Sequence, residues 1–110
     1  MARSSRLAQL KARVLAVVAA IPEGQVTTYG AIARRLQVTA RQVAFVLARL
    51  TPEESAQLPW FRVVAANGVV STIKLGTIGR RQIKCLRAEG VSVTVGNKVE
   101  DFDAIVWSPR

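Results

Sequence analysis

Apolar positions recur at helical spacing through the first half of the chain and predict three helices. The first carries an apolar stripe that ends before Pro22: Leu7, Leu10, Val14, Val17, Val18 and Ile21. A second short helix follows Thr28, which is a good N-terminal cap. Thr39, followed three residues later by Gln42, has the sequence of a capping box at the start of a third helix, 40–50. Two short helices joined by a tight turn predict a helix-turn-helix.

The second half of the chain shows shorter, strand-like patterns. Residues 61–64 form a short, largely apolar segment that is β-branched at its end, and residues 69–73 would be the returning strand. The Asn67-Gly68 pair between them is a strong signal for a hairpin turn. A hairpin that follows a helix-turn-helix is a wing. A last helix is expected over 80–89. Alternation with polar residues then predicts a strand through Val91, Val93 and Val95.

These elements predict a mainly α fold with a small β-hairpin, which is a winged helix-turn-helix domain. The length fits a single domain over residues 1–110 with a modest core. Residues 91–110 would be its C-terminal strand and a tail that packs back on the body. No apolar run reaches the ~20 residues that a membrane span needs, and no signal peptide is visible. We therefore expect no membrane partner.

The predicted third helix has one apolar face and one face without bulk. Its core stripe consists of Val43, Val46, Leu47 and Leu50. The other face holds Ala40, Ala44 and Ala48 at intervals of four, with Arg41 and Arg49 beside them. Small side chains let a helix approach another surface closely. Alanine is also simply a good helix former on a solvated face, and the alanines alone favour that second interpretation.

The charge of the chain changes this balance. Sixteen Lys and Arg residues against seven Asp and Glu give a net charge of +9. The acids Glu100, Asp101 and Asp103 gather near the end, so the excess of positive charge lies in the first 90 residues. A small protein this basic most often binds a polyanion, and the helix-turn-helix makes nucleic acid the favoured one. A generic basic surface is the alternative.

Two absences limit the chemistry that the chain can perform. There is no histidine, which removes the usual general base and most zinc sites. There is one cysteine, Cys85, so an internal disulfide is impossible and a reducing cytoplasm fits. Cys85 lies in a predicted helix, where a packing role is expected. We find no nucleophile with a base and no metal site, so we expect a cytoplasmic protein that is not an enzyme and needs no cofactor.

Four segments of the chain occur in a recognisable order. They are Ile21 to Gly30, Ala40-Arg41-Gln42-Val43, Pro59-Trp60-Phe61-Arg62-Val63-Val64 with Asn67-Gly68, and Gly79 to Gly90. As an ordered set they resemble the C-terminal, DNA-binding domain of O6-alkylguanine-DNA alkyltransferases. In that family the third segment reads Pro-Cys-His-Arg-Val, and its cysteine takes the alkyl group.

The third segment departs from the family at the reactive position. Trp60 stands where the family has cysteine, and this replacement marks the alkyltransferase-like proteins, which usually read Pro-Trp-His-Arg. Phe61 stands at the usual histidine. Tryptophan offers a flat ring and one N–H donor but no nucleophile, and phenylalanine cannot act as a base. Alkyl transfer is therefore not expected.

The resemblance implies a protein that binds O6-alkylguanine in duplex DNA without repairing it. Its third helix would enter the minor groove, and the nucleotide would be flipped into a pocket formed by Pro59, Trp60, Phe61 and Tyr29. Tyr29 would press on the neighbouring phosphate, while Arg41 would fill the space left in the base stack. The lesion would then be passed to nucleotide excision repair, whose proteins are candidate partners of a monomeric chain.

Further DNA contacts are expected around this helix-turn-helix. The candidates are Thr28, Ala40, Gln42, Ala44, Ala48, Arg34, Arg35, Arg49 and Arg62, with Lys74 and Arg80 as additional phosphate contacts. For Arg62 a structural or backbone contact is the favoured role. The alternative function is a winged-helix transcription regulator, but an alanine-rich helix offers few side chains that could read base edges.

Overall fold

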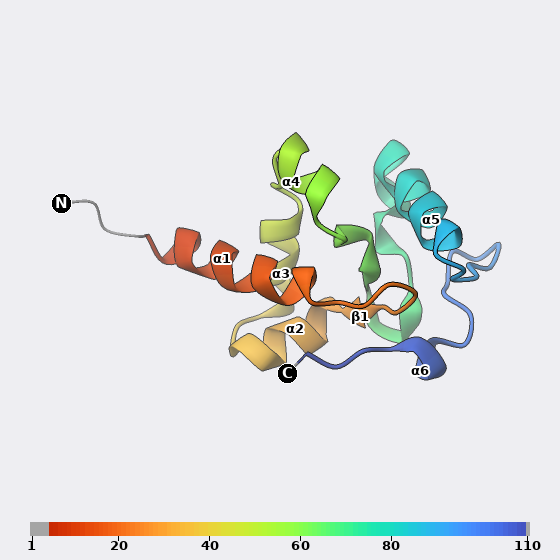
Figure 1. Ribbon diagram of the computed structural model, residues 1–110, viewed down its shortest axis with the longest axis horizontal. Helices are drawn as coiled ribbons and strands as arrows, with labels where there is room; N and C mark the ends of the chain where they lie inside the picture. Colours follow the sequence, from red (N-terminus) through yellow and green to blue (C-terminus); the bar gives the residue numbers. More distant parts are fainter. Residues whose placement is uncertain (1–4, 110) are drawn as a thin grey trace.

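The fold is organised around two hydrophobic cores, and Figure 1 shows how the helices and strands are arranged. The computed structural model describes residues 5–109. In chain order the elements are α1 (Arg6–Ala19), β1 (Thr27–Thr28), α2 (Tyr29–Leu36), α3 (Ala40–Leu47), α4 (Pro52–Gln57), the 3-10 turn η1 (Trp60–Arg62), β2 (Val63–Val64), η2 (Ala66–Gly68), η3 (Ser71–Leu75), α5 (Thr77–Ala88) and α6 (Phe102–Ile105). None of the helices in this part of the chain is long and apolar enough to cross a membrane.

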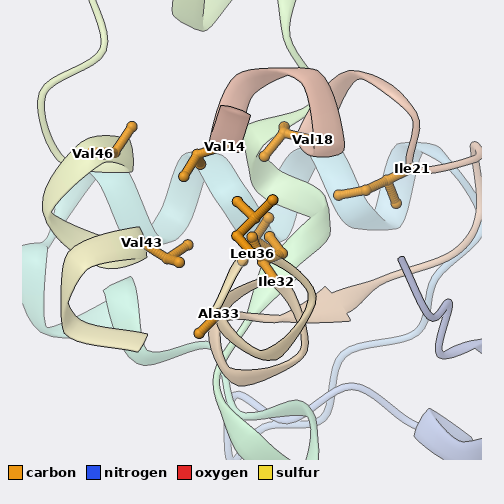
Figure 2. Close-up of a cluster of buried hydrophobic side chains, with 9 residues drawn as sticks. Val14, Val18, Ile21, Ile32, Ala33, Leu36, Val43 and Val46 are labelled. Carbon is orange, nitrogen blue, oxygen red and sulfur yellow. The ribbon is translucent and has the colours of Figure 1, made fainter. Parts of the chain in front are cut away.

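The first core joins α1, α2 and α3. Most of its buried side chains come from these helices, with Ile21 from the segment after α1 and Val63 from β2; Figure 2 labels Val14, Val18, Ile21, Ile32, Ala33, Leu36, Val43 and Val46. The predicted apolar stripe of α1 is buried only toward its C-terminal end. Leu7, near the start of α1, is 52% exposed, because the first turns of α1 project beyond α2 and α3 (Figure 1).

The helix-turn-helix prediction is confirmed by the caps that delimit α2 and α3. The Thr28 hydroxyl accepts the Ala31 N–H at 3.0 Å at the start of α2. Gln37 ends α2 in the left-handed conformation, with φ 59°. Thr39 and Gln42 form the predicted capping box, with the Gln42 N–H donating to the Thr39 hydroxyl at 3.1 Å. These side-chain bonds satisfy backbone N–H groups that a helix start would otherwise leave without partners.

The third helix ends three residues before its predicted end. α3 stops at Leu47, although its apolar pattern continues to Leu50. The cause lies in the next element, since Thr51 caps α4 and Pro52 is its first residue. A proline disfavours helical backbone at the residue before it, and Thr51 is accordingly extended.

The predicted β-hairpin is wrong in its strand pairing. Asn67 and Gly68 do turn the chain, with φ values of 63° and 85°, but residues 71–75 form the 3-10 helix η3. β2 instead pairs in parallel with β1, in the register Thr27 to Val63. The wing is completed by the C-terminal segment, since Val69 bridges Lys98 in antiparallel fashion.

The C-terminal segment packs back on the body, as expected. Val93 bridges Val99 across a turn, while Val95 at that turn is fully exposed, so the predicted strand is reduced to isolated bridges. Further on, the Trp107 N–H donates to the carbonyl of Val26 at 2.7 Å, and the Trp107 side chain packs against the first core. The tail therefore closes the side of the molecule on which β1 lies.

The second core lies beneath α5, which begins at Thr77, three residues before its predicted start. The sequence from Lys74 to Gly79 suggests a flexible linker, but Gly79 lies inside α5 and is buried against η3. A Cβ atom at this position would lie 2.3 Å from the Ile73 Cα. Glycine therefore permits a close helix-to-backbone contact here.

Replacement of Gly79 by alanine is expected to destabilise the protein. Alanine favours helix intrinsically, but its methyl group would collide with the backbone of η3, so we expect a loss of about 3 kcal/mol in the free energy of unfolding. Gly96→Ala is the matched control, since a Cβ there meets only the Thr94 hydroxyl at 3.6 Å. Chemical denaturation of both variants measures the difference. Equal stabilities would contradict the close contact.

Candidate nucleic-acid interface

The outer face of α3, together with Ala48 and Arg49 just after its end, presents the predicted DNA-contacting residues to solvent. Ala40, Arg41, Gln42, Ala44, Ala48 and Arg49 are all exposed, while Val43 and Val46 fill the core. Successive residues of an α-helix are about 100° apart around the axis. The line of Ala40, Ala44 and Ala48 is therefore flanked by a second line, formed by Arg41, Phe45 and Arg49.

Phe45 is a member of this face that the sequence analysis missed. Its side chain is 40% exposed. The Arg49 guanidinium lies 3.5 Å from the centroid of the Phe45 ring, and Arg49 Nη1 donates to the Phe45 carbonyl at 3.2 Å. The signal was available, because Arg41, Phe45 and Arg49 are spaced by four residues, as the alanines are.

Two of the expected DNA contacts also serve as helix caps. Thr28 accepts the Ala31 N–H, and the side-chain oxygen of Gln42 accepts the Thr39 N–H at 2.9 Å. The amide donors of Gln42 remain suited to a phosphate oxygen. In both cases the same side chain orders the helix start and lies at its positive end, where an anion is favoured.

Tyr29 is the first residue of α2 and is half-buried against the first core. Burial raises the pKa of the Tyr29 hydroxyl, and a hydrogen bond with the Ser71 side chain opposes this shift. The hydroxyl is consequently protonated at neutral pH and can donate to an anionic oxygen. Arg34 and Arg35 are exposed in the last turn of the same helix, and Lys74 and Arg80 are exposed on η3 and α5.

The predicted pocket residues Pro59, Trp60 and Phe61 form a half-buried turn directly before β2. The rings of Trp60 and Phe61 meet edge to face, with centroids 6.1 Å apart. Because β1 and β2 run in parallel, Tyr29 follows one strand while Trp60 and Phe61 precede the other. The structure thus attaches both groups to one strand pair and places them at its opposite ends.

Gln82 holds this turn in place and was not identified from the sequence. It is 1% exposed, and its side-chain amide donates to the carbonyls of Phe61 at 3.0 Å and Val63 at 2.8 Å. The Thr72 hydroxyl donates to its side-chain oxygen. A glutamine beside Ile83 and Leu86 on the buried stripe of α5 is the sequence signal that could have indicated a buried polar contact.

Of the two roles expected for Arg62, the structure supports the structural one. Its Nε donates to Glu89 Oε1 at 2.9 Å, its Nη1 donates to the Ile21 carbonyl at 2.8 Å, and its Nη2 is ion-paired with Glu89. The two side chains are only 14% and 12% exposed. Arg62 therefore has a structural role, in place of the DNA contact that was its other candidate role.

The carboxylate of Glu89 is the centre of this network. Burial raises its pKa, but the hydrogen bonds from Arg62 and the Gly24 N–H, together with the charge of Arg62, outweigh burial and leave the pKa below its ordinary value. The Gly24 N–H lies 3.1 Å from Glu89 Oε1. The network ties the segment after α1, the turn η1 and the end of α5 together.

The described residues show no assembled metal site. No group of three or more His, Cys, Asp or Glu side chains among residues 5–109 is placed to hold a metal ion. Cys85 is a free, half-buried thiol on α5, outside the turn that carries Trp60. The chemical capacity of the site lies in aromatic surface, arginines and helix N-termini.

We expect the Glu89 network to stabilise the protein in a pH-dependent way. Because the folded-state pKa lies below that of an unfolded glutamate, about 4.3, the contribution is complete above about pH 5 and is lost as the pH falls through the folded-state pKa. Glu89→Gln should lower stability at pH 7 by about 3 kcal/mol, since the Arg62 charge loses its partner, and should flatten the acid side of the stability profile. Thermal unfolding from pH 3 to pH 7 measures this, with Glu100→Gln as the exposed control. An acid side as steep as that of the unsubstituted protein would contradict the proposed network.

Comparison with known proteins identifies relatives over most of the chain. Residues 9–91 match the family described as "6-O-methylguanine DNA methyltransferase, DNA binding domain". A "DNA base-flipping protein" of Escherichia coli (strain K12) is 46% identical over 98 residues, which cover 87% of this chain and 72% of the relative. "Alkyltransferase-like protein 1" of Schizosaccharomyces pombe is 32% identical over 109 residues, covering 94% of this chain and 99% of the relative.

The solved structures that resemble this chain are of an alkyltransferase-like protein from S. pombe, as is one of the sequence relatives. The crystal structure of the S. pombe alkyltransferase-like protein in complex with damaged DNA containing O6-carboxymethylguanine has a TM-score of 0.81, at 32% identity. It covers 96% of this chain and the whole of the solved chain. A second structure of the S. pombe protein with DNA gives the same TM-score at 31% identity. The chain belongs to the family of the 6-O-methylguanine DNA methyltransferase DNA-binding domain, among its alkyltransferase-like proteins.

Proposed function

We propose that this protein recognises O6-alkylguanine in duplex DNA, flips the damaged nucleotide out of the helix and holds it without removing the alkyl group. The observation that carries the proposal is the likeness, over 96% of this chain, to a protein solved on DNA that contains O6-carboxymethylguanine. The name of the E. coli relative, a base-flipping protein, supports the same action. The residues of this chain supply the parts that such an action needs.

Docking of α3 in the minor groove is the first step of the mechanism. The exposed line of Ala40, Ala44 and Ala48 lets the helix backbone approach the floor of the groove. Arg41 lies in the first turn of α3 and is exposed, so its guanidinium can enter the base stack as the nucleotide leaves. Tyr29 lies at the N-terminus of α2, where its hydroxyl and the helix dipole both favour a phosphate.

Capture of the base is the second step. Unstacking costs a few kcal/mol, and a lesion that pairs badly lowers this cost. Trp60 offers an aromatic wall for the flipped base, and Phe61 meets it edge to face. Gln82 and Arg62 hold the backbone of this turn, so the wall is in place before DNA binds.

Absence of alkyl transfer follows from the residues at this wall. Alkyl transfer needs a thiolate with a group that activates it, and this turn offers indole and phenyl rings. The thiol of Cys85 belongs to α5. Non-enzymatic recognition also gives the protein a signalling role, in which the bound lesion is handed to nucleotide excision repair. We propose that the protein acts as a cytoplasmic monomer and associates with the nucleoid if it is bacterial.

The first test compares two duplexes that differ only in O6-methylguanine or guanine at one position. We expect clearly tighter binding to the methylated duplex in fluorescence anisotropy at physiological salt. Mass spectrometry of the recovered DNA should find the methyl group still in place. Equal affinities would remove the lesion pocket from the proposal, and loss of the methyl group would overturn its non-enzymatic part.

Arg41→Ala should reduce the preference for the lesion more than it reduces binding to plain DNA. We expect the ratio of the two dissociation constants to fall about 10-fold, because the vacated space in the stack is no longer filled. Arg81→Ala, on the exposed side of α5, is the matched control and should leave the ratio unchanged. An Arg41 variant that weakens both duplexes equally would argue against the intercalating role.

A further inference from the structure

A groove between α1 and α3 includes Arg41 and Gln42, already assigned to DNA contacts, but its other lining residues have no role in the mechanism described above. Its volume is about 590 Å³, and it lies beside the outer face of α3. Four of its apolar lining residues are Leu7, Leu10, Val38 and Phe45. Three arginines, Arg6, Arg13 and Arg41, contribute positive charge to it, and none of the described residues that line it is acidic. The groove thus combines an apolar surface with a cationic rim.

Phe45 lines one side of the groove, and its ring is held by Arg49, which lies outside the groove lining. The Arg49 guanidinium lies over the ring of Phe45 at 3.5 Å, a distance at which a cation–π interaction is effective. This interaction and the bond from Arg49 to the Phe45 carbonyl restrict both side chains. A side chain that is ordered before binding loses less conformational entropy on contact with a ligand.

Arg13 is fixed on the other side of the groove. Its Nη2 donates to the carbonyl of Leu36 at 2.9 Å, at the C-terminal end of α2. A guanidinium has five N–H donors, so this bond positions Arg13 and leaves other donors for a ligand. Arg6 lies on the projecting first turn of α1.

The dimensions of DNA indicate what the groove between α1 and α3 contacts when α3 docks in the minor groove. A helix with its side chains is about 10 Å wide, whereas the minor groove of B-DNA is about 6 Å wide. The alanine line can face the groove floor only if the flanks of α3 rest against the groove walls. The line of Arg41, Phe45 and Arg49 lies about 100° around the helix from the alanines. This line therefore faces one wall of the DNA minor groove.

We propose that this groove binds the sugar–phosphate backbone of one DNA strand, with Phe45 packed against deoxyribose and Arg6 and Arg13 placed on phosphates. This inference rests on the docking of α3 in the proposed function. Each wall of the DNA minor groove consists of apolar deoxyribose edges and anionic phosphates. These match the apolar and cationic lining of the groove between α1 and α3. The groove is continuous with the DNA-binding face because Arg41 belongs to both. A protein ligand in this groove would have to share Arg41 with DNA, which disfavours it as the occupant.

The role predicted for Phe45 is affinity for any duplex, without discrimination of the lesion. Phe45→Ala should weaken binding to the O6-methylguanine duplex and to the plain duplex by the same factor, about 5-fold, through loss of apolar contact. The ratio between the two dissociation constants should not change. The slope of log affinity against log salt should also stay the same, whereas Arg6→Ala should reduce it by about 1.

Two further variants separate the chemistry of Phe45 from its effect on the helix. Phe45→Leu keeps apolar bulk and should bind DNA within about 2-fold of the unsubstituted protein. Phe45→Gln has comparable length but is polar, and should lose as much affinity as Phe45→Ala. Val95→Ala alters an exposed apolar residue in the distant C-terminal turn and serves as the control. Circular dichroism confirms that the helices are retained.

The outcomes are distinguishable from those of the proposed function. If the unsubstituted protein binds both duplexes equally, the lesion proposal fails, but an affinity loss from Phe45→Ala on plain DNA still supports the groove. Affinities for Phe45→Ala and Phe45→Gln that match the Val95→Ala control would overturn it. A loss confined to the methylated duplex would assign Phe45 to the lesion pocket instead. Unchanged DNA affinity with a change in sedimentation would assign the groove to a second copy of this chain.

Discussion

The placement of one short segment, Pro59 to Val64, determines how the rest of this molecule is arranged. The segment runs between the two cores. Val63 is buried in the first core and Val64 in the second. Its backbone is held by β1 on one side and by Gln82 on the other. A buried carbonyl without a partner costs free energy comparable to a lost hydrogen bond. The aromatic turn therefore has a defined position relative to the helix-turn-helix.

The position of this segment also explains why the protein keeps a largely buried charged pair, Arg62 and Glu89. Arg62 and Glu89 are largely withdrawn from water, which costs free energy unless both charges are well hydrogen-bonded. Here the guanidinium also reaches the Ile21 carbonyl, and the carboxylate also accepts the Gly24 N–H. The pair thus links three segments that are far apart in the sequence. Its contribution is to orientation as well as to stability, since it fixes the turn on which Trp60 sits.

Helical geometry places two different lines of side chains next to each other on α3. One line of small side chains suits close approach, and the neighbouring line carries two arginines and a phenylalanine. In the proposed function, Arg41 enters the base stack, Phe45 and Arg49 face the DNA backbone, and the aromatic turn at Trp60 contacts the flipped base. In the two proposals above, Phe45 contributes affinity for any duplex, whereas Arg41 and Trp60 contribute to selection of the lesion.

Local features of the fold could be predicted from the sequence because they depend on residues a few positions apart. The Thr28 cap, the Thr39 and Gln42 capping box and the apolar stripes have this origin, and they establish the helix-turn-helix. The shortened end of α3 was missed because the Thr51-Pro52 start of α4 overrides a helical pattern. The motif around Trp60 also identified the family without any structure.

Long-range features were decided by the tertiary structure. The sequence shows Val63 and Val64 as strand formers but does not show whether β1 or residues 69–73 pair with them, since both choices bury apolar surface. It likewise does not show that Arg62 meets Glu89 or that Phe45 borders a groove with α1. The sequence by itself predicted the presence of α1, α2, α3 and α5, the caps of α2 and α3, the basic charge and the tryptophan at the family's reactive cysteine position. The tertiary structure alone decided which strand edges, buried charges and exposed rings share a neighbourhood, because these contacts close loops whose partners no local pattern specifies.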